Sequence, residues 1–213
     1  MTRIALIHAL AHSVAPINDA FERSWPQAQR MNLLDDSLSA DLAQSGRGLD
    51  AAMHERFRVL ADYAVATGAE AILFTCSAFG PCIEAVAARH SRIPVLKPNE
   101  AMVDMAVRSG SKVGLLASFE PTLRSMPAEF PLEAQPVTAL AEGALDALNR
   151  GDTAGHDEAA ARAALGLRER GCEVIALAQF SLARAADAVK AATGLPVLTT
   201  VDSAIQELQR RLS

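Results

Sequence analysis

The chain has 213 residues, of which 50% are apolar and 21% are charged, and its formal net charge is -5. This composition is typical of a folded globular protein and excludes the disordered and fibrous classes. The negative charge, and the lack of any Lys/Arg cluster longer than Arg210-Arg211, argue against a nucleic-acid-binding protein. The length suits two small domains better than one minimal domain.

The three cysteines, Cys76, Cys82 and Cys172, cannot all pair in disulfides. The apolar run at residues 4–7 is too short for a secretory signal, and His8 interrupts it. No stretch approaches the roughly 20 apolar residues that a membrane-spanning helix needs. We therefore expect a cytoplasmic protein with free thiols and no membrane partner.

In the first half of the chain, short apolar runs alternate with helical patterns. The predicted strands are residues 3–8, 31–34, 71–75 and 93–96. The predicted helices follow Pro16, cover residues 50–67 up to Gly68, and follow Pro81. The segment 35–48 is polar and rich in Gly and Ser, which predicts a long loop.

The second half repeats this alternation. Its predicted strands are residues 112–117, a segment around Val137, residues 173–178 and residues 196–198. Its predicted helices are residues 99–107, a helix-rich block at 141–170, a helix from Leu182 and a final helix ending at Leu212. Strict alternation of strands and helices predicts parallel sheets with right-handed crossovers, and therefore an α/β fold.

An internal repeat links the two halves. Residues 68–86 align without a gap to residues 171–189, with identical Gly, Glu, Ile, Ala and Val positions. Ile-Pro-Val-Leu at 93–96 then falls opposite Leu-Pro-Val-Leu at 195–198. Any two strand–helix units share some matches by chance, but a shared order of four elements favours duplication. We expect two similar Rossmann-like units, each with a parallel sheet.

Functional sites of parallel α/β proteins form beyond the carboxyl ends of the strands. Polar or nucleophilic residues follow four predicted strands, at residues 8–13, 75–78, 118–122 and 179–181. Helices begin near these points, so free backbone N–H groups are expected beside hydroxyl, thiol and amide groups. This combination favours a carboxylate or phosphate ligand.

Cys76 is the most reactive candidate, because it lies between a strand end and a helix N-terminus and is flanked by Thr75 and Ser77. In this position the pKa of a thiol can fall below its usual value of about 8.5. The alternative is a buried structural cysteine, which is the usual state of a free thiol. Cys82 is expected in the core of the next helix, and Cys172 is expected to be structural.

Two motifs within this two-unit layout point to a family. Thr-Cys-Ser-Ala at 75–78 and Gly-Leu-Leu-Ala-Ser-x-x-x-Thr at 114–122 resemble the aspartate/glutamate/hydantoin racemase superfamily, which also contains maleate isomerase and arylmalonate decarboxylase. The resemblance spans the whole chain. It implies a cofactor-independent enzyme with no metal that moves protons next to the carboxylate of a small amino or dicarboxylic acid, and it is compatible with a homodimer.

The resemblance also implies a domain arrangement and a site. The second unit, residues 99–198, is inserted before the last helix, which returns to the first unit, residues 1–98 plus 199–213. The active site is expected in the cleft between the units, with Cys76 as thiol acid/base. The expected substrate-binding residues are Ser77, Ala78, Ser118, Thr122, Gln179 and Ser181.

The chain departs from the racemase pattern at the second acid/base. Racemases of the family use one cysteine at the strand end of each half, but here Gln179 stands opposite Cys76, and a glutamine amide does not exchange protons near neutral pH. His8 is the second catalytic candidate, since its ordinary pKa is near 6.5. The alternative is a strand-end histidine bonded to backbone groups. His54, His90 and His156 are expected to be surface helix residues.

Three functions remain open at this point. The first is isomerase or racemase chemistry. The second is a single-cysteine lyase resembling the decarboxylase, and the third is a small-anion-binding protein without activity. A depressed Cys76 pKa favours an enzyme, whereas a normal or raised pKa favours the binding protein. The missing second thiol leads us to expect chemistry on one face of the substrate only.

Overall fold

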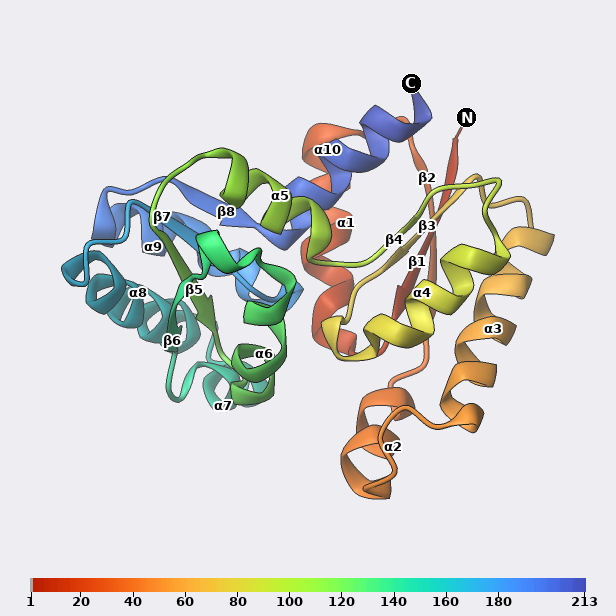
Figure 1. Cartoon of the computed structure of the whole chain (residues 1–213), viewed down its shortest axis with the longest axis horizontal. Helices are drawn as coiled ribbons and strands as arrows, with labels where there is room; N and C mark the ends of the chain where they lie inside the picture. The colour runs from red at the N-terminus through yellow and green to blue at the C-terminus, as the bar shows by residue number, and fades with distance from the viewer. Residues whose placement is uncertain (1) are drawn as a thin grey trace. The chain divides into compact units, whose positions relative to one another are not determined.

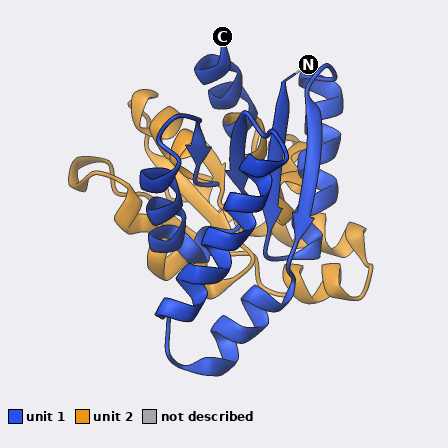
Figure 2. Cartoon of the chain, turned by 90° about the vertical axis from the view of Figure 1, so that its right-hand side faces the viewer, with its two compact units in different colours: residues 1–98, 204–213 blue, residues 99–203 orange. Residues whose placement is uncertain are grey.

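The computed structural model describes residues 2–213 and contains two four-stranded parallel sheets (Figure 1). The strand orders are β2-β1-β3-β4 and β6-β5-β7-β8, so the two sheets share one topology. This confirms the predicted α/β class with two similar parallel-sheet units. Figure 2 distinguishes the two compact units, residues 1–98 with 204–213 and residues 99–203, which are described separately below.

Unit 1 contains the first sheet and its helices. Its strands are β1 (Arg3–His8), β2 (Gln29–Leu34), β3 (Ala71–Phe74) and β4 (Val95–Leu96). Its helices are α1 (Val14–Ser24), α2 (Ser37–Ser45), α3 (Ala51–Ala66) and α4 (Gly80–Arg89), with short 3-10 turns η1 (Ala11–Ser13) and η2 (Ser77–Phe79). The last helix, α10 (Thr200–Leu212), begins in unit 2 and ends in unit 1.

Unit 2 contains the second sheet. Its strands are β5 (Val113–Ala117), β6 (Val137–Leu140), β7 (Val174–Leu177) and β8 (Val197–Thr199). Its helices are α5 (Glu100–Arg108), α6 (Glu120–Ser125), α7 (Ala144–Asn149), α8 (Thr153–Glu169) and α9 (Ala186–Thr193). Its 3-10 turns are η3 (Met126–Glu129), η4 (Leu132–Ala134) and η5 (Phe180–Ala185).

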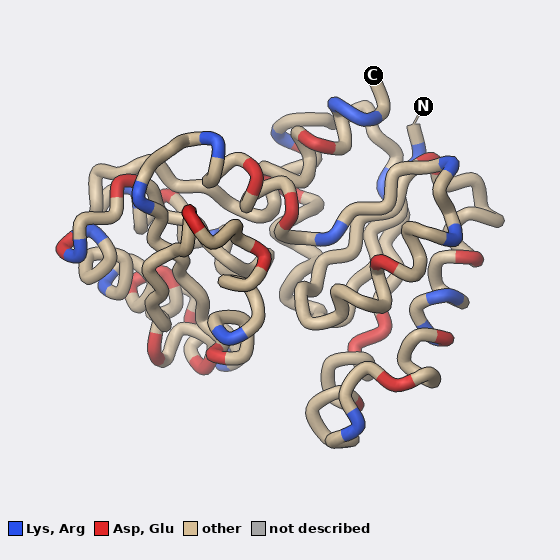
Figure 3. The backbone as a smooth tube through the Cα atoms, in the orientation of Figure 1, with Lys and Arg blue, Asp and Glu red and all other residues tan. Residues whose placement is uncertain are grey.

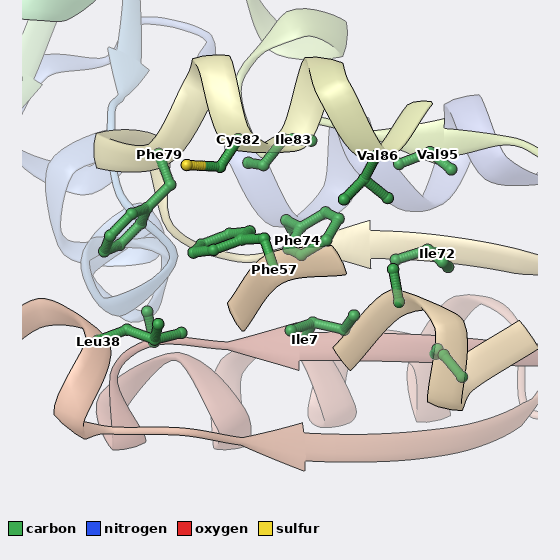
Figure 4. Close-up of a cluster of buried hydrophobic side chains, with 14 of the residues drawn as sticks. Ile7, Leu38, Phe57, Ile72, Phe74, Phe79, Cys82, Ile83, Val86 and Val95 are labelled. Atoms are coloured by element: carbon green, nitrogen blue, oxygen red, sulfur yellow. The ribbon is translucent and has the colours of Figure 1, made fainter. Parts of the chain in front are cut away.

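Alternating residues of the first sheet face different helices. Ile7, Ile72 and Phe74 point to the side covered by α3 and α4, while α1 lies on the opposite side (Figures 1 and 4). Phe57 of α3 stacks on Phe74, with ring centroids 5.3 Å apart, and lies 4.9 Å from the ring of Phe79 (Figure 4). These three rings pack α3 and the η2 turn against the sheet, next to the carboxyl end of β3.

The second sheet is covered on both faces in the same way. Leu116, Ile175 and Leu177 pack against residues of α7, α8 and α9. The intervening residues Leu115 and Ala176 pack on the other face, against residues of α5 and η3. Burial on both faces explains why these strands are short continuous apolar runs in the sequence.

One pair of aligned residues makes the same contact in both units. In unit 1, the Glu70 carboxylate accepts a hydrogen bond from the backbone N–H of Arg3 at 3.1 Å, and in unit 2 Glu173 accepts one from Lys112 N–H at 3.1 Å. The backbone N–H of each glutamate donates to the carbonyl oxygen of the same partner, at 2.8 Å in both cases. The repeat seen in the sequence is therefore a repeat of structure.

The segment 35–48 differs from its prediction. It was expected to be a loop, but it contains the nine-residue helix α2, which ends at Gly46 with φ +60°. Leu38 is fully buried and Leu42, one turn later, is partly buried, so the apolar periodicity of α2 is limited to two leucines in a polar segment. Tertiary contacts, described below, hold it against α3.

Charges of both signs are interspersed along the helices of each unit (Figure 3). Several pair at helical spacing, such as Arg58 with Glu55 and Asp62 on α3. Within residues 2–213, no helix is both long enough and apolar enough to cross a membrane.

Candidate active site

The carboxyl end of the first sheet brings His8, Thr75 and Cys76 together. Strands β1 and β3 are neighbours, and Ile7 is in register with Phe74, so the residues that follow them lie side by side. The backbone N–H of Thr75 continues the ladder by donating to the Ile7 carbonyl at 3.1 Å. Cys76 is the first residue beyond this ladder, and η2 begins directly after it.

Cys76 is partly buried, and two hydrogen-bond donors lie beside its thiol. Burial raises the pKa of Cys76, while hydrogen bonds from the Ala78 backbone N–H and the Ser39 side chain act in the opposite direction. The expected lowering of this pKa is therefore wrong: removal of the thiolate from water outweighs the local donors. The pKa has the direction expected for a binding protein.

Ser39 is a site residue that sequence reasoning missed. It lies on α2, and its one hydroxyl proton is shared between the Cys76 sulfur and the carbonyl oxygen of Ala9, which lies 2.8 Å away, just beyond the end of β1. Because α2 lies in a polar segment predicted to be a loop, no pattern distinguished Ser39 from the other serines there.

Arg56 of α3 anchors the segment that carries Ser39. Its guanidinium lies 2.6 Å from an Asp35 carboxylate oxygen and 2.6 Å from one of Asp41. Burial acts to raise the pKa of Asp35, but hydrogen bonds from Ser37 and Arg56 outweigh it and hold this pKa below its usual range. Asp35 is thus an ion-paired carboxylate that stabilises α2.

His8 is completely buried, and both of its ring nitrogens have partners. Nδ1 lies 2.9 Å from Thr75 Oγ1, and Nε2 lies 3.0 Å from Asn32 Oδ1. Since Asn32 Oδ1 can only accept, Nε2 carries the proton, and the Thr75 hydroxyl donates to Nδ1. Burial lowers the pKa of His8 against the opposing effect of the Asn32 bond. The partners of this neutral histidine are thus side chains, not backbone groups.

The carboxyl end of the second sheet brings Ser118 and Gln179 together. The Gln179 Oε1 atom accepts one hydrogen bond from the Ser118 backbone N–H, at 2.7 Å, and a second from the Ser118 hydroxyl, at 3.0 Å. Two donors thus converge on one oxygen atom. This is the arrangement that a carboxylate or enediolate oxygen requires.

The other predicted binding residues also follow strand ends. Thr122 is buried in α6, and its N–H donates to the Phe119 carbonyl at 3.1 Å. Ser181 is buried in η5, the 3-10 turn that begins directly after Gln179. Ser77 is partly exposed and Ala78 is exposed in η2. The sites predicted from the sequence therefore form two groups, one at each sheet, and the location of the active site between the units stays a prediction.

Cys82 lies in the core, as predicted, and Cys172, which was expected to be structural, is also buried. Cys82 is 1% exposed and extends beside Phe79 (Figure 4), and Cys172 is 4% exposed. The prediction that His156 is a surface residue is wrong, because its exposed fraction is 0% and its face of α8 packs toward the core. The Asp157 carboxylate accepts a hydrogen bond from the Nδ1 atom of His156. In residues 2–213, no three His, Cys, Asp or Glu side chains are grouped as metal ligands.

Comparisons with known proteins show the family and the fold of the chain. A family model described as Asp/Glu/Hydantoin racemase matches residues 10–208. No curated protein sequence matches the chain.

Several solved structures share the fold. Glutamate racemase from Thermus thermophilus, in complex with β-chloro-D-alanine, has a TM-score of 0.73 at 20% identity, with 99% of this chain and 80% of that chain covered. Allantoin racemase from Pseudomonas fluorescens has a TM-score of 0.72 at 17% identity, covering 99% and 91%. An aspartate racemase homologue from Pyrococcus horikoshii has a TM-score of 0.72 at 14% identity, covering 99% and 98%. At these identities the likeness is one of fold.

Proposed function

The chain belongs to the Asp/Glu/Hydantoin racemase family, and from this premise we propose that it is a cofactor-independent enzyme that moves protons next to the carboxylate of a small amino or dicarboxylic acid. Cys76 is the proposed acid/base. The observation that carries the proposal is the position of this thiol at the end of β3, beside the Ser39 hydroxyl and the Ala78 N–H. Ligands of parallel α/β sheets bind at the strand ends, and acid/base chemistry needs a group there, such as a thiol, that can give and take a proton.

The raised pKa of Cys76 determines the form in which the thiol rests. A protonated thiol is ready to act as an acid: when a malonate loses CO₂, the electron pair of the broken C–C bond forms an enediolate, and the thiol gives its proton to the α-carbon. The resulting thiolate is a stronger base for the same reason, because the environment that raises its pKa favours recapture of a proton. When it removes an α-proton, the electron pair of the C–H bond moves into the carboxylate, which becomes the enediolate.

The enediolate oxygens need hydrogen-bond donors, and we propose that the Gln179 amide nitrogen supplies one. The two donors of Ser118 already hold the Gln179 oxygen, so Ser118 contributes by directing the amide nitrogen at the substrate. Ser77, Ala78, Thr122 and Ser181 complete the proposed binding group. The glutamate racemase of Thermus thermophilus was solved with β-chloro-D-alanine, which supports a ligand of amino-acid size.

The proposed chemistry acts on one face of the substrate. A racemase needs an acid or base on each face of the planar intermediate, and Gln179 does not transfer protons near neutral pH. In the resting structure, both nitrogens of His8 are engaged by Thr75 and Asn32. One-sided isomerase chemistry, or a lyase reaction that ends in protonation by Cys76, fits this set of residues better than racemisation. We also infer a cytoplasmic location, in which thiols stay reduced, and a homodimer stays a prediction.

A specific observation favours a second candidate, a small-anion-binding protein without activity. Burial raises the pKa of Cys76, and Gln179 occupies the position of the second thiol. Such a protein would use the Gln179 amide, held by Ser118, for binding and would leave the α-proton in place.

The test is hydrogen exchange in deuterated water with a panel of small amino acids, hydroxy acids and dicarboxylic acids. The enzyme is expected to introduce deuterium at the α-carbon of at least one compound, or to release CO₂ from a malonate, and Cys76→Ala is expected to abolish it. Tight binding of a carboxylate by calorimetry with no exchange and no turnover would instead establish the binding protein.

A further inference from the structure

We propose that His8 is a positioning residue: its side chain holds Thr75, and through Thr75 it fixes the Cys76 thiol against Ser39 and the Ala78 N–H. The proposal rests on the proposed function only for the catalytic use of Cys76. The geometry of the resting thiol can be tested without any substrate.

The hydrogen bonds around His8 run in one direction. The Thr75 hydroxyl donates to His8 Nδ1, and His8 Nε2–H donates to Asn32 Oδ1. Asn18 Nδ2 also donates to this oxygen at 2.9 Å, and to the Val14 carbonyl at 2.7 Å. The network therefore connects the end of β3 with β1, β2 and the first turn of α1.

The second unit shows that the fold does not need this polar pair. The matched contacts of Glu70 with Arg3 and of Glu173 with Lys112 set the correspondence between the units. In unit 1, His8 lies five residues after Arg3, and Thr75 lies five residues after Glu70. In unit 2, an alanine lies five residues after Lys112, and another lies five residues after Glu173. Those alanines, Ala117 and Ala178, are 0% and 1% exposed.

The same strand-end position is thus built from polar side chains in one unit and from methyl groups in the other. Burying an imidazole and a hydroxyl away from water costs free energy unless both are hydrogen-bonded, and two apolar groups avoid that cost. The unit that keeps the polar pair is the unit in which the next residue is Cys76. In unit 2 the next residue is Gln179, which Ser118 already holds.

Thr75 connects the pair to the thiol. Its backbone N–H is bonded to the Ile7 carbonyl at 3.1 Å and its hydroxyl to His8 at 2.9 Å, so both its main chain and its side chain are fixed. The direction of the next Cα–Cβ bond, that of Cys76, follows from this. Without the hydrogen bond between the Thr75 hydroxyl and His8, the turn from β3 into η2 has one restraint fewer. The hydrogen bonds of the Cys76 thiol with Ser39 and the Ala78 N–H are then expected to weaken.

The experiment measures the rate of Cys76 alkylation by iodoacetamide as a function of pH in the full chain. Thr75→Val keeps the shape of the side chain but removes its hydroxyl, and we expect the midpoint of the profile to move up by about half a pH unit, which slows alkylation about threefold at pH values below it. Thr75→Ser restores the hydroxyl and is expected to return most of the shift. An unchanged or lowered midpoint in Thr75→Val would overturn the proposal.

A second variant covers the case in which Thr75→Val unfolds because His8 Nδ1 is left without a donor. In His8→Leu/Thr75→Val both polar groups are gone, and Asn32 Oδ1 still accepts from Asn18. This variant is expected to fold and to show the same upward shift, and an unshifted profile in it would also overturn the proposal. Cys82 and Cys172 are buried, so mass spectrometry reports unfolding as a second or third alkylated thiol. Absence of turnover on every substrate would contradict the proposed function and leave this result intact.

Discussion

The side chain of Gln179 is oriented by Ser118. Because a backbone N–H can only donate, the atom 2.7 Å from Ser118 N must be the amide oxygen, and the hydroxyl bond at 3.0 Å goes to the same atom. The amide nitrogen is then left as the donor for other groups. Gln179 thus differs from the cysteine of the family racemases in presenting a fixed, uncharged donor.

This orientation makes Gln179→Glu an informative substitution. A glutamate at 179 can still accept both hydrogen bonds from Ser118, but it replaces the amide donor by a carboxylate that repels an anionic substrate. We expect KM to rise, or kcat/KM to fall, by the equivalent of about 1–3 kcal/mol, the range for a lost hydrogen bond to a charged group. Steady-state kinetics on the substrate found by the exchange panel measures this, with the thermal midpoint as a check of folding. Unchanged kinetics would mean that Gln179 does not face the substrate.

Cys76→Ala is expected to abolish α-proton exchange with little loss of stability, because the thiol lies at a strand end and only part of it is buried. The matched controls are Cys82→Ala and Cys172→Ala, which alter core positions. These two should lower the thermal midpoint, as large-to-small core changes do, yet leave turnover within a few fold. Exchange at the wild-type rate in Cys76→Ala would exclude this thiol as the acid/base.

Ser118→Ala and Thr122→Ala test the anion site of unit 2. Ser118→Ala keeps the backbone donor at position 118 and removes only the hydroxyl. Each variant is expected to lower kcat/KM by the equivalent of about 1–3 kcal/mol. Ser125→Ala is a control on the same helix, since the Ser125 hydroxyl donates to the Pro121 carbonyl. If both test variants match wild type, the carboxylate binds elsewhere.

The parts of the fold that the sequence predicted are those with strong periodicity or repetition. Continuous apolar runs identified the strands buried on both faces, and the Glu70/Glu173 match identified the duplication. Helix α2 was missed because only Leu38 and Leu42 pack its nine residues on the core, and because Arg56, which pairs with Asp35, lies 21 residues away in sequence. Single-sequence patterns do not contain such pairings.

The candidate site was predictable only as far as strand ends locate it. His8 and Thr75 were predicted at the ends of two strands, but the pairing of these strands and the hydrogen bonds of His8 to Thr75 and Asn32 depend on strand register and rotamers. The direction of the Cys76 pKa was predicted wrongly for the same reason. A helix N-terminus is visible in the sequence, whereas the burial that outweighs it depends on how α2 packs.

Stability is expected to fall as the solution is made mildly acidic, because burial lowers the pKa of His8 from its ordinary 6.5. The unfolded chain then binds a proton more readily than the folded one. The stability due to neutral His8 is therefore complete above pH 6.5 and is lost as pH falls from 6.5 through the lower folded-state pKa. Thermal unfolding at pH 7.5 and 5.5 measures the slope, and His8→Leu should flatten it. An equally steep decline in His8→Leu would assign the slope to other groups.

The last prediction concerns the face of the substrate opposite Cys76. A single thiol reaches one side of a fixed, planar enediolate, and the role proposed for Gln179 is to stabilise charge without moving a proton. In deuterated water the product is therefore expected to carry deuterium in one configuration only. Gln179→Cys supplies a thiol at the position of the second family cysteine and is expected to introduce slow racemisation, with Gln179→Ser as the control that lacks a thiol. If His8 acts only by holding Thr75, His8→Ala should slow this one-sided exchange without changing the configuration of its product. Equal exchange of both enantiomers by the unmodified protein would refute one-sidedness, and loss of one enantiomer alone in His8→Ala would establish His8 as the second acid/base.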